Sequence, residues 1–163
     1  MKIYRAKNRY NRVSVAGDEN KMYIFTDNGD RTSGKGKISD DSEYSVRFGK
    51  KGLCYPSLTT AVIRGLPNAY PITTQKKYVQ RPREIEGNWN DEDFNEFKKI
   101  IDDDFENIKK ACVEKGYEEI VFPNQGVLNG GISRLTIERT PKLFNYIVEK
   151  EIELKNFNPQ IKK

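Results

Sequence analysis

A long amphipathic helix that leads directly into a buried strand constrains this chain more than any other feature. From Asp91 to Lys115 apolar residues recur every three or four positions, acidic residues fill the first turn, and Gly116 follows the last turn. This pattern predicts a helix over 91–115. The run Glu119–Phe122 is short and apolar, and it predicts a strand. Helices that alternate with apolar strands favour a three-layer α/β domain with parallel strand pairing.

Other segments fit the same alternation. Lys21–Thr26 is apolar on both faces, which is typical of a central parallel strand covered by helices. Ala69–Thr74 predicts a strand that either lies at a sheet edge or begins only after Pro71, because proline cannot donate a ladder hydrogen bond. Residues 13–15 alternate as a half-buried strand would. Thr140, followed by a proline, predicts the N-cap of a last helix.

The length of 163 residues suits one domain, and we expect a single α/β domain over residues 1–155 followed by a polar tail over 156–163. No apolar run is long enough to span a bilayer, and the first residues lack the apolar segment of a signal peptide. We therefore expect a cytoplasmic protein without a membrane partner. The two cysteines are too few for a disulfide framework, and Cys112 belongs to the core face of the long helix.

The chain has no histidine. Ser-His-Asp and Cys-His catalytic arrangements and histidine-bearing zinc sites are therefore excluded. Carboxylates, lysine, hydroxyl groups or ordered water would have to carry any catalysis. We expect neither a metal site nor a cofactor, and the acidic run Asp102–Asp104 predicts a solvated helix face, since three consecutive residues point in different directions around a helix.

The net charge of +5 favours an anionic partner. Basic residues are scattered, however, and acidic clusters such as Asp102–Asp104 interrupt them. Because this is not the footprint of a nucleic-acid-binding surface, nucleic acid is the less favoured partner and a phosphate-bearing small molecule the more favoured one.

Two loops that follow strands carry the candidate site. After Phe122 the chain reaches Gly126, Gly130 and Gly131, and glycines at a strand end let backbone N–H groups face an anion. After Thr26 a polar loop offers side chains and backbone for ribose and phosphate, namely Asn28, Arg31, Thr32, Ser33 and Gly34. A tight turn without a ligand is the alternative for the first loop, and a solvated surface loop is the alternative for the second.

Further candidates lie outside these two loops. Arg64 and Lys76, with Arg31, supply positive charge for phosphate, and Thr74 ends a row of hydroxyl side chains after a strand. The single tryptophan, Trp89, either stacks on a ligand ring or fills the edge of the core.

Several segments resemble a family of small phage-encoded proteins, most of them uncharacterised, which in turn resemble macro domains, the ADP-ribose-binding α/β fold. The segments are residues 23–28, 61–69, 71–74, 120–131 and 140–143, so the likeness spans most of Tyr23–Ile147. The resemblance implies a three-layer macro-domain-like sandwich with a mixed, mostly parallel central sheet.

The resemblance also implies roles for particular residues. Asn28 matches the loop that holds the distal ribose in macro domains. Gly126, Asn129, Gly130 and Gly131 match the loop that cradles the diphosphate. The first loop departs from the pattern because Thr32-Ser33-Gly34 replaces a run of glycines, and the second departs from it because Leu128 stands where a glycine is common.

Two functions follow. The first is binding of ADP-ribose or a related adenine nucleotide in the cytoplasm of a bacterial host, where the protein would remove ADP-ribose or sequester a nucleotide signal made by a host defence. A hydrolase of this kind would use ordered water, Asp27 or Asp30 as its base, although Asp27 fits equally well as a cap of its own loop. The second is a non-catalytic protein that binds a host defence protein or nucleic acid through basic loops such as Lys76-Lys77.

Overall fold

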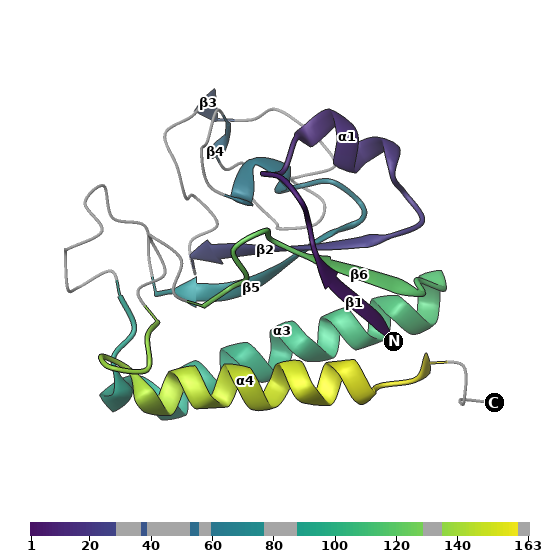
Figure 1. Ribbon diagram of the computed structural model, residues 1–163. Helices are drawn as coiled ribbons and strands as arrows, with labels where there is room; N and C mark the ends of the chain where they lie inside the picture. Colours follow the sequence, from purple (N-terminus) through teal and green to yellow (C-terminus); the bar gives the residue numbers. More distant parts are fainter. Residues whose placement is uncertain (29–36, 39–52, 56–59, 77–87, 129–134, 160–163) are drawn as a thin grey trace.

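The computed structural model describes residues 1–28, 37–38, 53–55, 60–76, 88–128 and 135–159 of the chain. The chain folds as a parallel sheet with helices packed on it (Figure 1). In chain order the elements are β1 (Lys2–Arg5), α1 (Arg12–Gly17), β2 (Met22–Asn28), β3 (Lys37–Ile38), β4 (Leu53–Tyr55), the 3-10 helix η1 (Thr60–Ile63), β5 (Ala69–Gln75), the 3-10 turn η3 (Asp91–Asp93), α3 (Phe94–Lys115), β6 (Glu119–Phe122) and α4 (Pro141–Asn156).

The sheet has the strand order β1-β6-β2-β5, and every pairing within it is parallel. The mixed sheet implied by the resemblance is therefore wrong for the described strands. The physical reason is that no two neighbours in this sheet are joined by a hairpin, which is the usual source of antiparallel pairing. The chain passes through α1 between β1 and β2 and through α3 between β5 and β6. β3 and β4 form a separate antiparallel pair.

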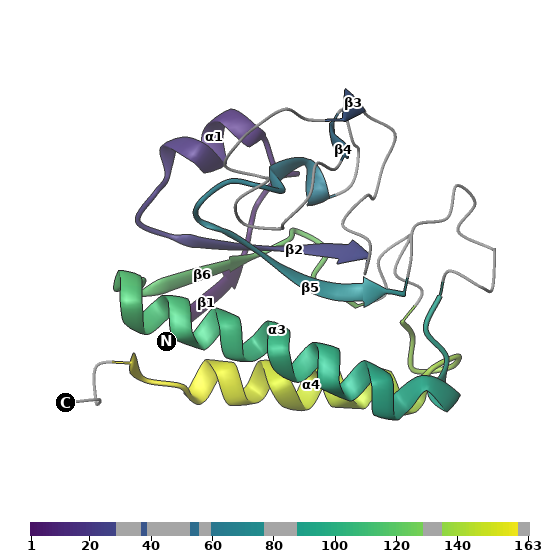
Figure 2. The same ribbon diagram turned by 180° about the vertical axis from the view of Figure 1, so that it is seen from behind.

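Helices cover the two faces of the sheet unequally. The long helices α3 and α4 lie side by side beneath one face, whereas α1 and η1 lie over the other, as Figure 1 and the reverse view in Figure 2 show. Both long helices run opposite to the strands, so their N-termini lie at the end of the sheet where β2 and β5 finish. This coverage explains why β2 is apolar on both faces.

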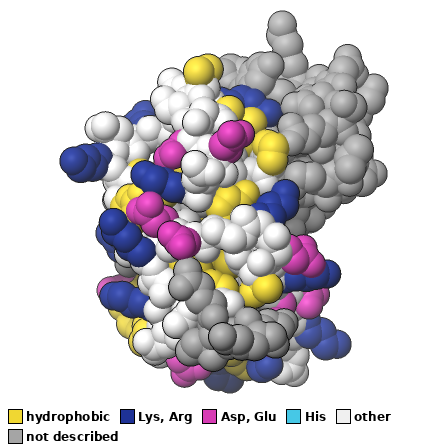
Figure 3. Space-filling view, turned by 90° about the vertical axis from the view of Figure 1, so that its right-hand side faces the viewer, with side chains coloured by type: hydrophobic (Ala, Val, Ile, Leu, Met, Phe, Trp, Pro, Cys, Tyr) yellow, Lys and Arg dark blue, Asp and Glu magenta, His cyan; other side chains and the backbone are white. Residues whose placement is uncertain are grey.

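At the opposite end, where the strands begin, charges of both signs alternate on the surface (Figure 3). Two ion pairs contribute, between Lys2 and Glu119 at 3.5 Å and between Lys21 and Asp18 at 3.6 Å. The described residues at this end therefore form no continuous basic surface. No helix in the described part of the chain is both long enough and apolar enough to cross a bilayer.

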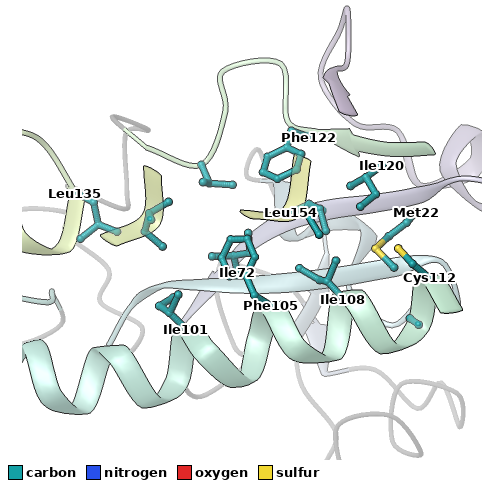
Figure 4. Packing of buried hydrophobic residues seen from close by; sticks show 14 of the residues in the cluster. Met22, Ile72, Ile101, Phe105, Ile108, Cys112, Ile120, Phe122, Leu135 and Leu154 are labelled. Carbon is teal, nitrogen blue, oxygen red and sulfur yellow. The ribbon is translucent and has the colours of Figure 1, made fainter. Parts of the chain in front are cut away.

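The main core lies between the sheet and the two long helices. Figure 4 shows Ile101, Phe105 and Ile108 of α3 directed toward sheet residues such as Ile72. A smaller apolar cluster fills the other face and contains Val15, Phe25, Ile63, Leu66 and Ala69. Met22 and Ile24 belong to the first cluster and Phe25 to the second, which is the alternation of a strand buried on both sides.

Several expectations about individual elements are confirmed. Gly116 ends α3 in the left-handed conformation with φ 72°, and Pro141 is the first residue of α4, after Thr140. β5, which contains Pro71, lies at the edge of the sheet. Cys112 is buried in the core, and burial raises the pKa of its thiol to about 11.

The strand expected at residues 13–15 is wrong, because this segment forms helix α1. The oxygen of the Asn11 side chain accepts hydrogen bonds from the backbone N–H groups of Val13 and Ser14, which caps the helix. Only Val15 faces the core, and Val13 is 82% exposed. A local side-chain cap therefore outweighs the weak strand propensity of two valines.

The expectation of a solvated face for Asp102–Asp104 is also wrong at one position. Asp104 is buried, and its Oδ2 atom accepts a hydrogen bond of 2.8 Å from the backbone N–H of Thr73. Asp102 lies at the surface between α3 and α4, where it accepts hydrogen bonds from Lys98 and Tyr146. The Asp104 carboxylate thus satisfies a backbone donor of the edge strand β5, which pairs with only one of the described strands.

Candidate functional site at the carboxyl edge of the sheet

Three segments that carry sequence candidates leave the sheet at one edge. Because β2, β5 and β6 belong to one parallel sheet, their carboxyl ends lie at the same edge. Residues 29–36 follow β2, residues 77–87 follow Lys76 after β5, and residues 129–134 follow the turn after β6. The candidates Asp30, Arg31, Thr32, Ser33, Gly34, Asn129, Gly130 and Gly131 lie in these segments and outside the described residues.

The boundary between β6 and β2 is the point where the connections diverge. After β2 the chain passes to the face that carries η1, and after β6 it passes to the face that carries α4. In open α/β sheets, ligands bind beyond the carboxyl ends of strands at such a switch point. The ladder between the two strands is also short, since it pairs only Met22 with Ile120 and Tyr23 with Val121.

Tyr10 occupies the place where β2 and β6 separate. Its hydroxyl oxygen lies 2.6 Å from the carbonyl oxygen of Ile24 and 3.2 Å from that of Val121. The single hydroxyl hydrogen is thus shared between a short bond to Ile24, the residue after the ladder on β2, and a longer bond to Val121, the last ladder residue of β6. Burial raises the pKa of this hydroxyl far above its ordinary value, so it remains a proton donor. Nothing in the local sequence pattern points to this role.

Asp27 and Arg64 form a buried ion pair beside the end of β2. The Arg64 Nε atom donates to Asp27 Oδ2 at 3.0 Å, and Arg64 Nη2 donates to Asp27 Oδ1. Both side chains are 0% exposed. The carbonyl oxygen of Arg64 accepts a hydrogen bond from Arg12, which ties the segment to α1. The structure thus joins two candidates that sequence reasoning treated separately, and the charge of each is balanced by the other.

Asn28 is the last residue of β2, opposite Gln75 in an irregular register. Thr74 is buried near the end of β5. Lys76 follows β5 and is partly exposed, with its Nζ atom 3.8 Å from Asp93 and 4.0 Å from Glu96. Like Arg64, Lys76 therefore has acidic neighbours that offset its charge.

Gly126 has a structural role at the end of β6. Its N–H donates to the carbonyl oxygen of Pro123 at 2.8 Å, and its φ is 76°, so this amide belongs to a turn. A Cβ at this position would lie 2.9 Å from Arg5 Nη2. The absence of a side chain therefore makes room for the guanidinium of Arg5, an exposed residue at the carboxyl end of β1 that the sequence reasoning missed.

The N-termini of α3 and α4 lie at this edge, but carboxylates already occupy them. Asp91 Oδ1 accepts hydrogen bonds from the backbone N–H groups of Lys142 and Leu143, at 3.2 and 3.4 Å. Asp93 accepts one of 2.9 Å from the N–H of Asn90. Asp91 thus occupies first-turn N–H groups of α4, and the acidic residues 91–93 with Glu96 oppose the positive end of the α3 dipole, so neither terminus suits a phosphate.

The described part of the chain contains no cluster of three or more His, Cys, Asp or Glu residues that could hold a metal ion. The family of unknown function DUF7831 matches residues 5–150. The chain belongs to DUF7831. The match extends from the end of β1 into α4, so the carboxyl edge described above lies within the DUF7831 region. Searches of curated proteins and of solved structures find no match.

Proposed function

We propose that this protein binds ADP-ribose or a related adenine nucleotide at the carboxyl ends of β2 and β6. The observation that carries the proposal is the switch point. The chain leaves these adjacent parallel strands toward opposite faces of the sheet, and both segments that resemble macro-domain ligand loops begin there.

The layers around the sheet agree with a three-layer, macro-domain-like arrangement. α3 and α4 cover one face, and α1 and η1 cover the other. The all-parallel sheet departs from the mixed sheet that the resemblance implies. The likeness therefore concerns the positions of two loops after two strands, and the function depends on the residues of the site itself.

The charges of the described residues indicate which cationic side chains are available to contact phosphate. Arg64 is neutralised by Asp27, and Lys76 lies near two carboxylates. Arg5 adjoins the turn after β6. Its guanidinium interacts electrostatically with the Glu151 carboxylate, but in the described part of the chain it forms no ion pair as close as that of Arg64. We therefore assign part of the diphosphate charge to Arg5, together with Arg31 and the backbone of residues 129–131.

Asp27 serves in this proposal as a positioning residue rather than as a general base. Both of its carboxylate oxygens bind Arg64, so neither is directed at a substrate. Cleavage of an ADP-ribosyl bond would then depend on ordered water or on Asp30. Binding alone would let a phage protein sequester a nucleotide defence signal in the bacterial cytoplasm.

Isothermal titration calorimetry with ADP-ribose, followed by chromatography of the ligand, tests the proposal. We expect saturable binding of ADP-ribose by the wild-type protein and loss of binding in Gly130→Phe, because a bulky side chain would fill the loop that approaches the diphosphate. Gly17→Phe is the control, since a Cβ at Gly17 meets no atom within 4 Å.

Unchanged affinity for ADP-ribose in Gly130→Phe would show that the loop at Gly130 does not contact the diphosphate. Failure to bind any adenine nucleotide, combined with oligonucleotide binding that weakens steeply with salt, would favour the alternative of an interaction protein that uses its basic loops.

A further inference from the structure

Trp89 carries a buried donor that lacks an acceptor. Its side chain is 1% exposed, and its Nε1 atom is the one buried side-chain nitrogen or oxygen in the described part of the chain without a hydrogen-bond partner. The residue is held firmly by two contacts. Its ring packs edge to face against Phe97, with 5.5 Å between the ring centres, and its carbonyl oxygen accepts a hydrogen bond of 2.9 Å from Arg139 Nη2. Buried donors are nearly always satisfied, so this N–H calls for an acceptor that the described residues do not supply.

The indole lies at the carboxyl end of β5. Lys76 follows the last residue of that strand, and its Nζ atom is 5.8 Å from the centre of the Trp89 ring. Gln75 and Asn88 join the two segments through a hydrogen bond of 3.3 Å. The Trp89 ring therefore lies against the side chain of Lys76, which is partly exposed at the end of the sheet where β5 finishes.

The surroundings indicate the chemistry of the acceptor. The charge nearest the Trp89 ring is the Lys76 ammonium, and Asp93 and Glu96 already lie 3.8 and 4.0 Å from it. A phosphate or carboxylate on the ligand would have to compete with these two carboxylates for Lys76. An uncharged acceptor, such as a heterocycle nitrogen or a sugar hydroxyl, would receive the N–H bond without needing a free cation.

We propose that the indole N–H of Trp89 donates to an uncharged acceptor on the nucleoside part of the ligand. The inference rests on the proposed function. It sets the orientation of the bound ligand, with the nucleoside on the β5 side of the carboxyl edge and the diphosphate on the β6 side. Trp89 thus contributes through its N–H as well as through packing.

The first test uses the free protein and needs no ligand. Trp89 is the only tryptophan, so replacing it with benzothienylalanine deletes one N–H and preserves the shape of the ring. We expect an unchanged or slightly raised melting temperature, because the substitution removes an unsatisfied donor. A fall of several degrees would overturn the inference, since the N–H would then be satisfied within the folded chain.

The second test measures ADP-ribose binding by both proteins. We expect the isosteric substitution to weaken affinity about three- to tenfold, the usual effect of one neutral hydrogen bond. In the wild-type protein, the single indole ¹H–¹⁵N resonance should move downfield when ADP-ribose is added. If ADP-ribose binds but the indole resonance of the wild-type protein does not move, this inference is overturned and the proposed function stands. The same holds if the substituted protein binds ADP-ribose with unchanged affinity. Absence of calorimetric binding would remove both.

Discussion

At the scale of single residues, the pair of Asp27 and Arg64 is the most consequential contact described. Two opposite charges lie fully buried at the end of β2, 37 positions apart in the sequence. Taking them out of water is costly, and two hydrogen bonds offset that cost only while both partners are present. We therefore interpret the pair as the contact that sets the position of β2 relative to the segment before β5.

Substitution of one partner should be severe. We expect Arg64→Met to lower the free energy of unfolding by about 3–5 kcal/mol, because it leaves the Asp27 carboxylate buried and unpaired. Urea denaturation measures the change. The double variant that adds Asp27→Val should recover much of the loss, since it removes both buried charges.

Lys110→Met is the control. Lys110 lies 4.0 Å from Glu114, and both side chains are largely exposed. This change should alter the free energy of unfolding by less than about 0.5 kcal/mol. Equal effects of Arg64→Met and Lys110→Met would contradict the interpretation of the buried pair.

At the scale of elements, the turn after β6 and the end of β1 form one unit. Gly126 adopts a positive φ that other residues tolerate poorly, and its missing side chain accommodates the Arg5 guanidinium. The same glycine thus permits the turn and leaves a cation beside the proposed diphosphate.

Two alanine substitutions separate these effects. Gly126 and Gly116 have similar φ values, 76° and 72°, but only a Cβ at Gly126 approaches Arg5. We expect both alanine variants to lose about 1–2 kcal/mol of stability from backbone strain. Only Gly126→Ala should also weaken ADP-ribose binding severalfold, because it displaces Arg5. Calorimetry on both variants measures this, and equal affinities would exclude a role for Arg5.

At the scale of the whole molecule, the elements with regular periodicity could be predicted from the sequence. The long helix ends at Gly116 because that glycine adopts the left-handed conformation, and β2 reads as a central strand because both of its faces are buried. Pro71 correctly indicated an edge strand. In each case a local pattern carries the information.

The features that the sequence did not reveal depend on distant partners. The hydroxyl of Tyr10 meets the backbone at Val121, 111 positions away, and Asp104 reaches Thr73 on another element. Asp27 could be identified as a candidate, but its pairing with Arg64 depends on how the segments fold together. No periodicity or spacing encodes such contacts, so the composition of the candidate site emerges only with the fold.

We propose above that an adenine nucleotide binds where β2 and β6 diverge. Amide chemical-shift mapping of the ¹⁵N-labelled protein during titration with ADP-ribose tests it most directly. We expect the largest shifts at the carboxyl edge, at Asn28, Gly126 and the residues that follow β2 and β6, and unchanged amides at Lys2 and Lys21 at the other end of the sheet. Shifts centred on the amino ends of the strands, or no shifts at saturating ligand, would contradict it.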